Sequence, residues 1–154
     1  MSPSDAPTAT GLLHSHRLVA HLATRHVKVW YYVYQHLTAD DTPLLTANVT
    51  SGWATHGAEV AFAFGTKGDA AVNELPFTDE EKRLSDEIIE RVVTLATEGF
   101  PGSAAGAEWP SVSTPVDSLP TLRFDTASNG GVALAFGYRE DACAFWASSI
   151  PDII

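Results

Sequence analysis

The chain has 154 residues and a mass of 16.5 kDa, which is enough for one ordinary domain. Apolar types make up 45% and charged types 18%, so intrinsic disorder over most of the chain is excluded. Nine basic residues against nineteen acidic ones give a net charge of −10, and we expect no nucleic-acid partner because phosphate binding needs a basic surface. No stretch approaches about eighteen consecutive apolar residues, so we expect no membrane span.

The first ten residues are rich in Ser, Pro, Ala and Thr, and we expect 1–10 to be a disordered segment ahead of a single unit over 11–154. They contain neither a basic nor an apolar region of the kind that a secretory signal has, which leaves the compartment open. Cys143 is the single cysteine, so a disulfide within the chain and a zinc knuckle are excluded.

The first expected elements are a helix over Leu12–Ala23 and a strand over Val27–Tyr34. Seven of the eight residues in that strand are β-branched or aromatic, and its apolar side chains fall on both faces. A strand of this kind is normally central in a parallel sheet with cover on each side. A turn over Asp40–Pro43 and a weak strand over Leu44–Thr50 follow.

The segment Trp53–Glu59 is expected to be a loop between apolar segments, and Thr78–Glu98 is the best helix in the chain. Thr78 and Glu81 form a capping box, and Gly99 ends the helix. Apolar residues at spacings of three and four predict one buried stripe. The stripe consists of Leu84, Ile88, Val92, Leu95 and Ala96.

The last third predicts a hairpin and a final helix. Short strands at Thr121–Phe124 and Val132–Phe136 flank the turn residues 129–131. The final helix covers Glu140–Ser149.

Histidines crowd the first third of the chain, at positions 14, 16, 21, 26 and 36. Their spacings fit poorly with a zinc site, which needs ligands three or four apart on a helix, so we interpret them as a solvated helix face and expect no metal. His56 differs because it lies in a loop after the most apolar strand, where an α/β hydrolase holds its general base. Taken alone, a loop histidine beside a glycine is more often a turn residue than a catalytic base.

The order of five segments resembles the C-terminal part of the type-B carboxylesterases, the cholinesterase-like branch of the α/β-hydrolases. These segments are VWYYVYQH (29–36), GWATHGAEVAFAFG (52–65), the long helix with its flanks (74–102), EWP (108–110) and CAFW (143–146). The resemblance covers roughly residues 10–150. It implies an α/β fold, as a C-terminal fragment of an α/β-hydrolase with the last core strand or strands, the catalytic-histidine loop, the long helix and a closing hairpin.

The resemblance also implies a function and a set of site residues. It places His56 at the family's catalytic histidine, within His56-Gly57-Ala58-Glu59, and makes the function carboxylic ester hydrolysis by a Ser/acid/His mechanism without a metal or organic cofactor. Gly57 supports the histidine, and Glu59 is either a carboxylate networked behind it or an exposed loop acid. Trp53 either lines the substrate pocket or simply packs.

Several features depart from the family pattern. The chain has Val92-Val93 where the family usually has Trp, Trp53 where it commonly has Gly, and no partner for Cys143. No Gly-x-Ser-x-Gly occurs, and the acid and oxyanion-hole loop of the family lie upstream of the matched part.

We therefore expect the chain alone to be inactive, with a small ester as substrate only when a missing N-terminal part completes it. The alternatives are a non-catalytic truncated or interaction protein of the same family, and an unrelated small binding domain. The apolar strand needs neighbours, so we expect a complementing chain or self-association. The family is often secreted, but these residues leave the compartment unknown.

Overall fold

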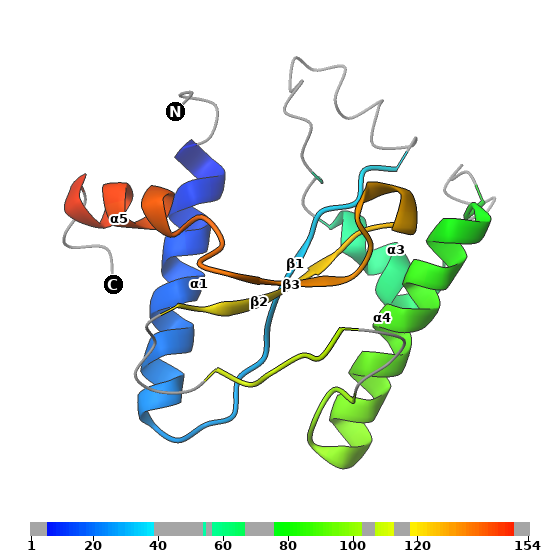
Figure 1. Ribbon diagram of the computed structural model, residues 1–154, viewed down its shortest axis with the longest axis horizontal. Coiled ribbons are helices and arrows are strands. Elements are labelled where there is room, and N and C mark those ends of the chain that lie inside the picture. Colours follow the sequence, from blue (N-terminus) through cyan, green and yellow to red (C-terminus); the bar gives the residue numbers. More distant parts are fainter. Residues whose placement is uncertain are drawn as a thin grey trace. The chain divides into compact units, whose positions relative to one another are not determined.

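The computed structural model describes residues 6–38, 54, 57–66, 76–102, 107–112 and 118–149, with side chains from residue 14 onward. Helices and strands alternate along the chain (Figure 1). The elements in order are α1 (Ala6–Thr24), β1 (Tyr31–Tyr34), α3 (Ala58–Phe64), α4 (Asp79–Glu98), β2 (Pro120–Phe124), the 3-10 helix η2 (Ala127–Asn129), β3 (Ala133–Phe136) and α5 (Glu140–Ser149). This mixture agrees with the expected α/β class.

The three strands form one sheet in the order β1-β2-β3. The amide of Gln35, just after β1, donates a hydrogen bond of 3.0 Å to the carbonyl of Phe124, the last residue of β2. The carboxyl ends of the two strands therefore lie together, which means that β1 and β2 run parallel. The connection from β2 to β3 is too short for a parallel crossover, so these strands form the expected hairpin.

Strand β1 differs from its expectation in length and place. It covers Tyr31–Tyr34 only, and among the described strands it is at the end of the order rather than in the centre. The earlier part of the apolar segment pairs elsewhere, because the carbonyl of Val29 accepts a 2.8 Å hydrogen bond from the amide of Val112. The apolar pattern thus extends beyond the ladder: Val29 packs against the core of other segments, whereas Val27 is 47% exposed.

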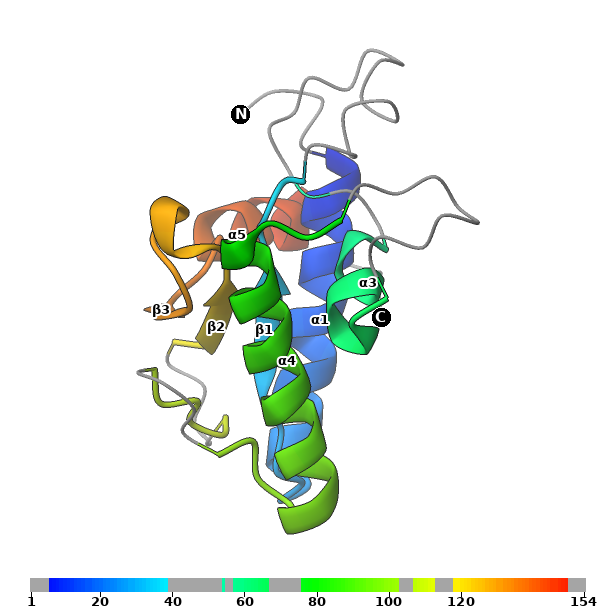
Figure 2. The same ribbon diagram turned by 90° about the vertical axis from the view of Figure 1, so that its right-hand side faces the viewer.

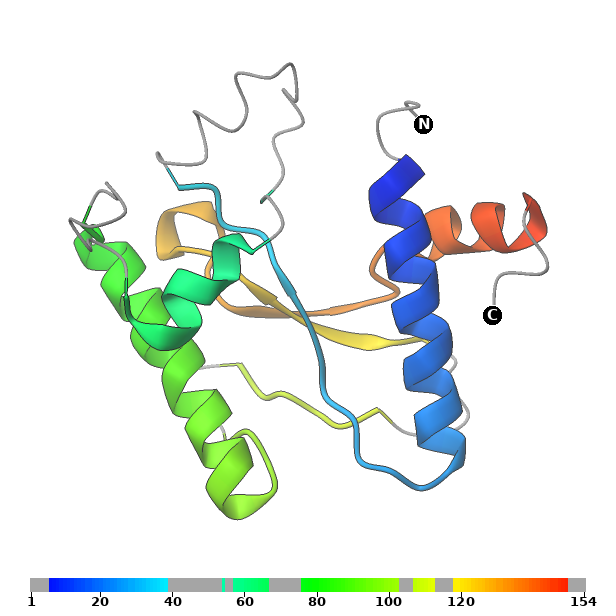
Figure 3. The ribbon, with the colours of Figure 1, turned by 180° about the vertical axis from the view of Figure 1, so that it is seen from behind.

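The chain divides into two compact units, and the first consists of residues 1–31, 110–121 and 135–154. Its core is a cluster of buried apolar side chains from α1 and from the 110–121 segment, with Val29 and Tyr31 packed against it. The cluster consists of Val19, Ala23, Val112 and Leu119. Helices α1 and α5 lie against each other (Figure 3).

The second unit, residues 32–109 and 122–134, holds α3 and α4. Helix α3 lies beside the amino-terminal half of α4 (Figure 2), and Ser85 of α4 donates a 2.7 Å hydrogen bond to the carbonyl of Phe62 in α3. The Phe62 side chain is fully buried, and Leu84 and Ile88 of α4 are buried too.

Helix α4 confirms the predicted ends. Thr78 is its N-cap, its hydroxyl accepts the Glu81 amide, and the Glu81 carboxylate accepts the Thr78 amide. Gly99 ends the helix in the left-handed conformation. The predicted stripe is buried only in its first half, since Val92 is 51% exposed. Among the described residues, nothing covers this later part of the stripe as fully as α3 covers the first.

Helix α1 begins at Ala6, earlier than the predicted Leu12, and so within the segment for which we expect disorder. Residues 1–5 of that segment, the turn at 40–43 and the weak strand at 44–50 lie outside the described residues. None of the described helices combines the length and the apolar character needed to cross a bilayer.

Candidate functional site

The candidate catalytic residue precedes helix α3. His56 and Trp53 both lie outside the described residues, whereas Gly57 and Glu59 are described. Gly57 is the N-cap of α3, with φ 85° and ψ −3°, and its carbonyl accepts the amide of Val60 at 3.1 Å. This left-handed conformation favours glycine and sets the direction in which the chain enters the helix from residue 56.

Glu59 was expected in a loop, but it lies in the first turn of α3. The expectation was wrong because a seven-residue helix with glycines at both ends shows little helical periodicity in sequence. The carboxylate of Glu59 acts on Tyr32 of β1, whose pKa is raised first by burial and then by this negative charge. The position of Glu59 relative to His56 stays a prediction.

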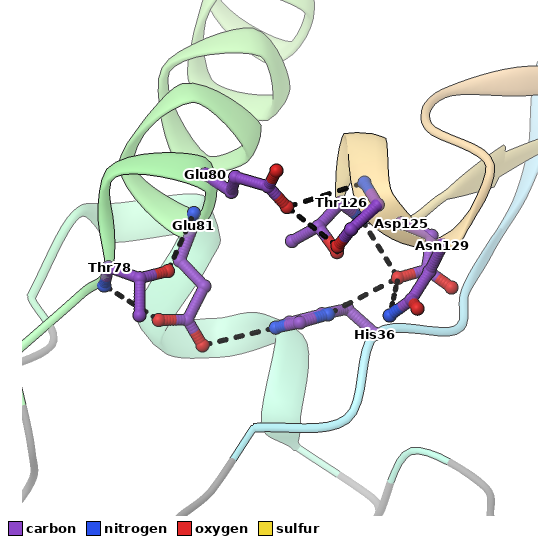
Figure 4. Close-up of polar contacts among 8 residues, drawn as sticks. His36, Thr78, Glu80, Glu81, Asp125, Thr126 and Asn129 are labelled. Atoms are coloured by element: carbon purple, nitrogen blue, oxygen red, sulfur yellow. Dashed lines mark hydrogen bonds and ion pairs between the residues drawn. The ribbon is translucent and has the colours of Figure 1, made fainter.

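A second histidine, His36, is the centre of a largely buried cluster of ionisable side chains in the second unit (Figure 4). It lies two residues after β1 and is 6% exposed. Its Nε2 lies 3.1 Å from Oε1 of Glu81 in the first turn of α4, and its Nδ1 lies 3.2 Å from Oδ1 of Asp125, directly after β2. The parallel strands bring His36 and Asp125 to the same edge of the sheet.

Both carboxylates of this cluster are already engaged as acceptors. Oε2 of Glu81 accepts the Thr78 amide at 2.7 Å, and Oδ1 of Asp125 accepts the Thr126 amide at 2.8 Å. Acceptor contacts of this kind favour the ionised carboxylate. Each of the two acid side chains is thus held by a backbone amide and by one nitrogen of the His36 ring.

A neighbouring contact joins the same two segments. Oε2 of Glu80 accepts the Ser128 hydroxyl at 2.7 Å and the Ser128 amide at 3.3 Å. The hydroxyl contact is the main reason why the pKa of Glu80 is lowered, and nearby Arg83 and His36 lower it further. The turn after β2 is thereby tied to the start of α4 at two places.

His36 is unsuited to be a general base in this arrangement. A general base needs a ring nitrogen within reach of the proton that it removes, whereas both nitrogens of His36 face carboxylates and the ring is buried. The interpretation of the early histidines as a solvated face was wrong for His36. A polar residue directly after an apolar strand was the available signal, because such positions lie at the carboxyl edge of a parallel sheet.

The described residues offer no activated nucleophile at this cluster. The Ser85 hydroxyl is buried and donates to a backbone carbonyl. Cys143 belongs to the first unit; it is a free, buried thiol whose pKa is raised by burial and by Glu140, which opposes thiolate formation. Within the described part of the chain, no group of three or more His, Cys, Asp or Glu side chains could hold a metal ion.

Comparison with known proteins decides the family. The sequence model of the carboxylesterase family matches residues 8–146. This chain belongs to the carboxylesterase family. It is 25% identical over 145 residues to acetylcholinesterase 1 of Caenorhabditis briggsae, covering 88% of the chain and 22% of that protein.

Solved esterases share the fold. An esterase from Clostridium hathewayi, described as hydrolysing aliphatic aromatic polyesters, matches 87% of the chain with a TM-score of 0.65 and 16% identity. A PNB esterase matches 76% with a TM-score of 0.53 and 22% identity. The chain spans 24% and 21% of these two proteins, and thus has the fold of about a quarter of an α/β-hydrolase esterase.

Proposed function

We propose that this chain contributes the catalytic histidine, His56, to the hydrolysis of a carboxylic ester by a Ser/acid/His mechanism. The observation that supports the proposal most is the family match over residues 8–146, a range that includes position 56. In such a mechanism the imidazole takes the proton of the serine hydroxyl as it attacks the ester carbonyl, then returns a proton to the leaving alcohol. Trp53 and Glu59 are proposed as neighbours of that imidazole.

The remaining groups of the mechanism come from elsewhere. The 154 residues contain no Gly-x-Ser-x-Gly, so the serine nucleophile of the proposed reaction is not among them. A histidine without its nucleophile has no hydroxyl to activate, and the proposal is therefore that the chain hydrolyses esters only together with the part of an esterase that carries nucleophile, acid and oxyanion hole.

A complementation experiment tests this proposal. The Clostridium esterase, shortened by the part that this chain matches, is co-expressed with the chain, and turnover of p-nitrophenyl butyrate is measured. We expect turnover with the wild-type chain, a fall of about 10³-fold or more with His56→Ala, and no turnover above buffer by the chain alone. His21→Ala, at an exposed position on α1, is the matched control and should leave turnover unchanged. Equal turnover by the wild type and His56→Ala contradicts the proposal.

A second candidate is a non-catalytic interaction protein of the same family, which is favoured by the missing nucleophile motif. It predicts that the chain associates with a partner, although neither the wild-type chain nor His56→Ala restores hydrolysis in the complementation experiment. Turnover of p-nitrophenyl acetate by the purified chain that is lost in His56→Ala would overturn both candidates, because it requires a nucleophile within these residues.

A further inference from the structure

His36 lies where it can control the geometry of the segment that carries His56. His36 and Glu81 are 45 residues apart in sequence, and the chain between them contains His56, helix α3 and the start of α4. Their 3.1 Å contact joins the two ends of this segment. A contact that joins the two ends of a long segment reduces the number of conformations that the residues between them can adopt.

Helix α3 is seated on the same cluster. The fully buried ring of Phe62 has its centroid 5.6 Å from the His36 ring, 5.3 Å from Tyr34 and 4.5 Å from Phe77. Edge and tilted contacts of this kind add to the burial of the rings. Gly57, the N-cap of α3, follows His56 directly in the chain. The planar peptide bond between them links the start of α3 to the candidate base.

The contacts of His36 decide how firmly this arrangement holds. Glu81 and Asp125 each accept a backbone amide in addition to their contact with the ring. Loss of the ring would leave both acid side chains, which are 8% and 14% exposed, without one of their partners, and a buried polar group that lacks a partner is costly.

We propose that His36 is a positioning residue of the carboxylesterase site: held between Glu81 and Asp125, it joins the two ends of the segment that carries His56 and packs against α3. This inference rests on the proposed function of His56. It assigns to His36 no contact with substrate. The role is instead to limit where the candidate base can lie.

The test compares the purified wild-type chain with His36→Gln, which keeps a donor but removes one of the two contacts. His21→Gln on α1 is the matched control. Amide hydrogen exchange should become at least about tenfold faster in α3 and the first turn of α4 with His36→Gln, since a hydrogen bond to a charged group contributes more than this factor to an opening equilibrium. Exchange in α1 and α5 should stay unchanged.

A further readout separates positioning from general stabilisation. In the complementation assay, His36→Gln should lower kcat by about tenfold to hundredfold with KM unchanged, as expected for a displaced base.

The outcomes distinguish the inference from the proposed function. Unchanged exchange in α3 overturns the inference whether or not any ester is hydrolysed. Hydrolysis that depends on His56 but not on His36 also overturns it and leaves the proposed function intact. If His36→Gln does not fold, Asp125→Asn removes one carboxylate while keeping the shape, and the same local acceleration is expected, to a smaller extent.

Discussion

At the scale of single residues, Gly57 connects the candidate histidine to a defined backbone conformation. Its φ of 85° lies in the left-handed region, and a Cβ added there would meet nothing within 4 Å. A substitution would therefore act through backbone strain alone, without a clash. A change in stability on substitution of Gly57 therefore measures the cost of the left-handed backbone conformation.

We expect Gly57→Ala to lower the free energy of unfolding by about 1–2 kcal/mol, the cost of placing a residue with a Cβ in the left-handed conformation. Urea denaturation of the purified chain measures the change. Gly57→Asn is the control, because Asn adopts this conformation more readily and should lose less. Equal losses for Ala and Asn would show that the left-handed conformation is not what the glycine provides.

The residue scale also shows why the His36 cluster could not be predicted from sequence. Its two partners are 45 and 89 residues away, and their approach depends on the parallel pairing of β1 with β2. Spacing along the chain instead groups His36 with the other early histidines. The prediction at position 56, by contrast, rests on local order, namely a histidine and a glycine between an apolar strand and an apolar segment, and it stays a prediction.

At the scale of elements, helix α4 was predicted almost to the residue because its signals are local. The capping box needs only Thr78 and Glu81, and Gly99 ends the helix through its own conformation. Helix α3 was missed because seven residues between two glycines show little helical periodicity, and strand β1 is shorter than the apolar segment that predicted it. Glu81 then acquires a second role that no local signal shows, as a partner of His36.

The capping box of α4 leads to a second prediction at this scale. The Thr78 hydroxyl accepts the Glu81 amide at 3.2 Å, and Thr78→Ala should lower the free energy of unfolding by about 1 kcal/mol. Thr97→Ala, at an exposed position near the end of the same helix, is the matched control and should stay within about 0.5 kcal/mol of the wild type. Thermal and urea unfolding of both variants measure the difference, and equal values would mean that the cap does not stabilise α4.

At the scale of the whole molecule, the family was predictable although single motifs were weak. Five segments in the order of the carboxylesterases carried the assignment, and the family match over residues 8–146 confirms it. The chain lacks the nucleophile motif and covers only 22% of the acetylcholinesterase that it matches. The proposed catalytic role of His56 therefore depends on a serine nucleophile, an acid and an oxyanion hole supplied by other residues.

Exposed apolar side chains in the second unit indicate how the chain behaves in isolation. Val92 and Val93 of α4 are 51% and 53% exposed, and Phe64 at the end of α3 is 75% exposed. Val92 belongs to the stripe that the sequence predicts to be buried, so its exposure means that this part of the stripe lacks cover within the described residues. Grouped exposed apolar side chains of this kind mark surfaces that bind other proteins or cause aggregation.

We therefore expect the purified chain to self-associate through α4, and Val92→Lys to shift it toward the monomer by placing a charge where a contact would have to exclude water. Sedimentation velocity over a range of concentrations measures the fraction of monomer. Thr97→Lys adds the same charge at an exposed polar position of the same helix and should leave the association unchanged. A wild-type chain that sediments as a monomer at every concentration would contradict this prediction. It would show that the exposed part of the α4 stripe does not drive association with a second chain.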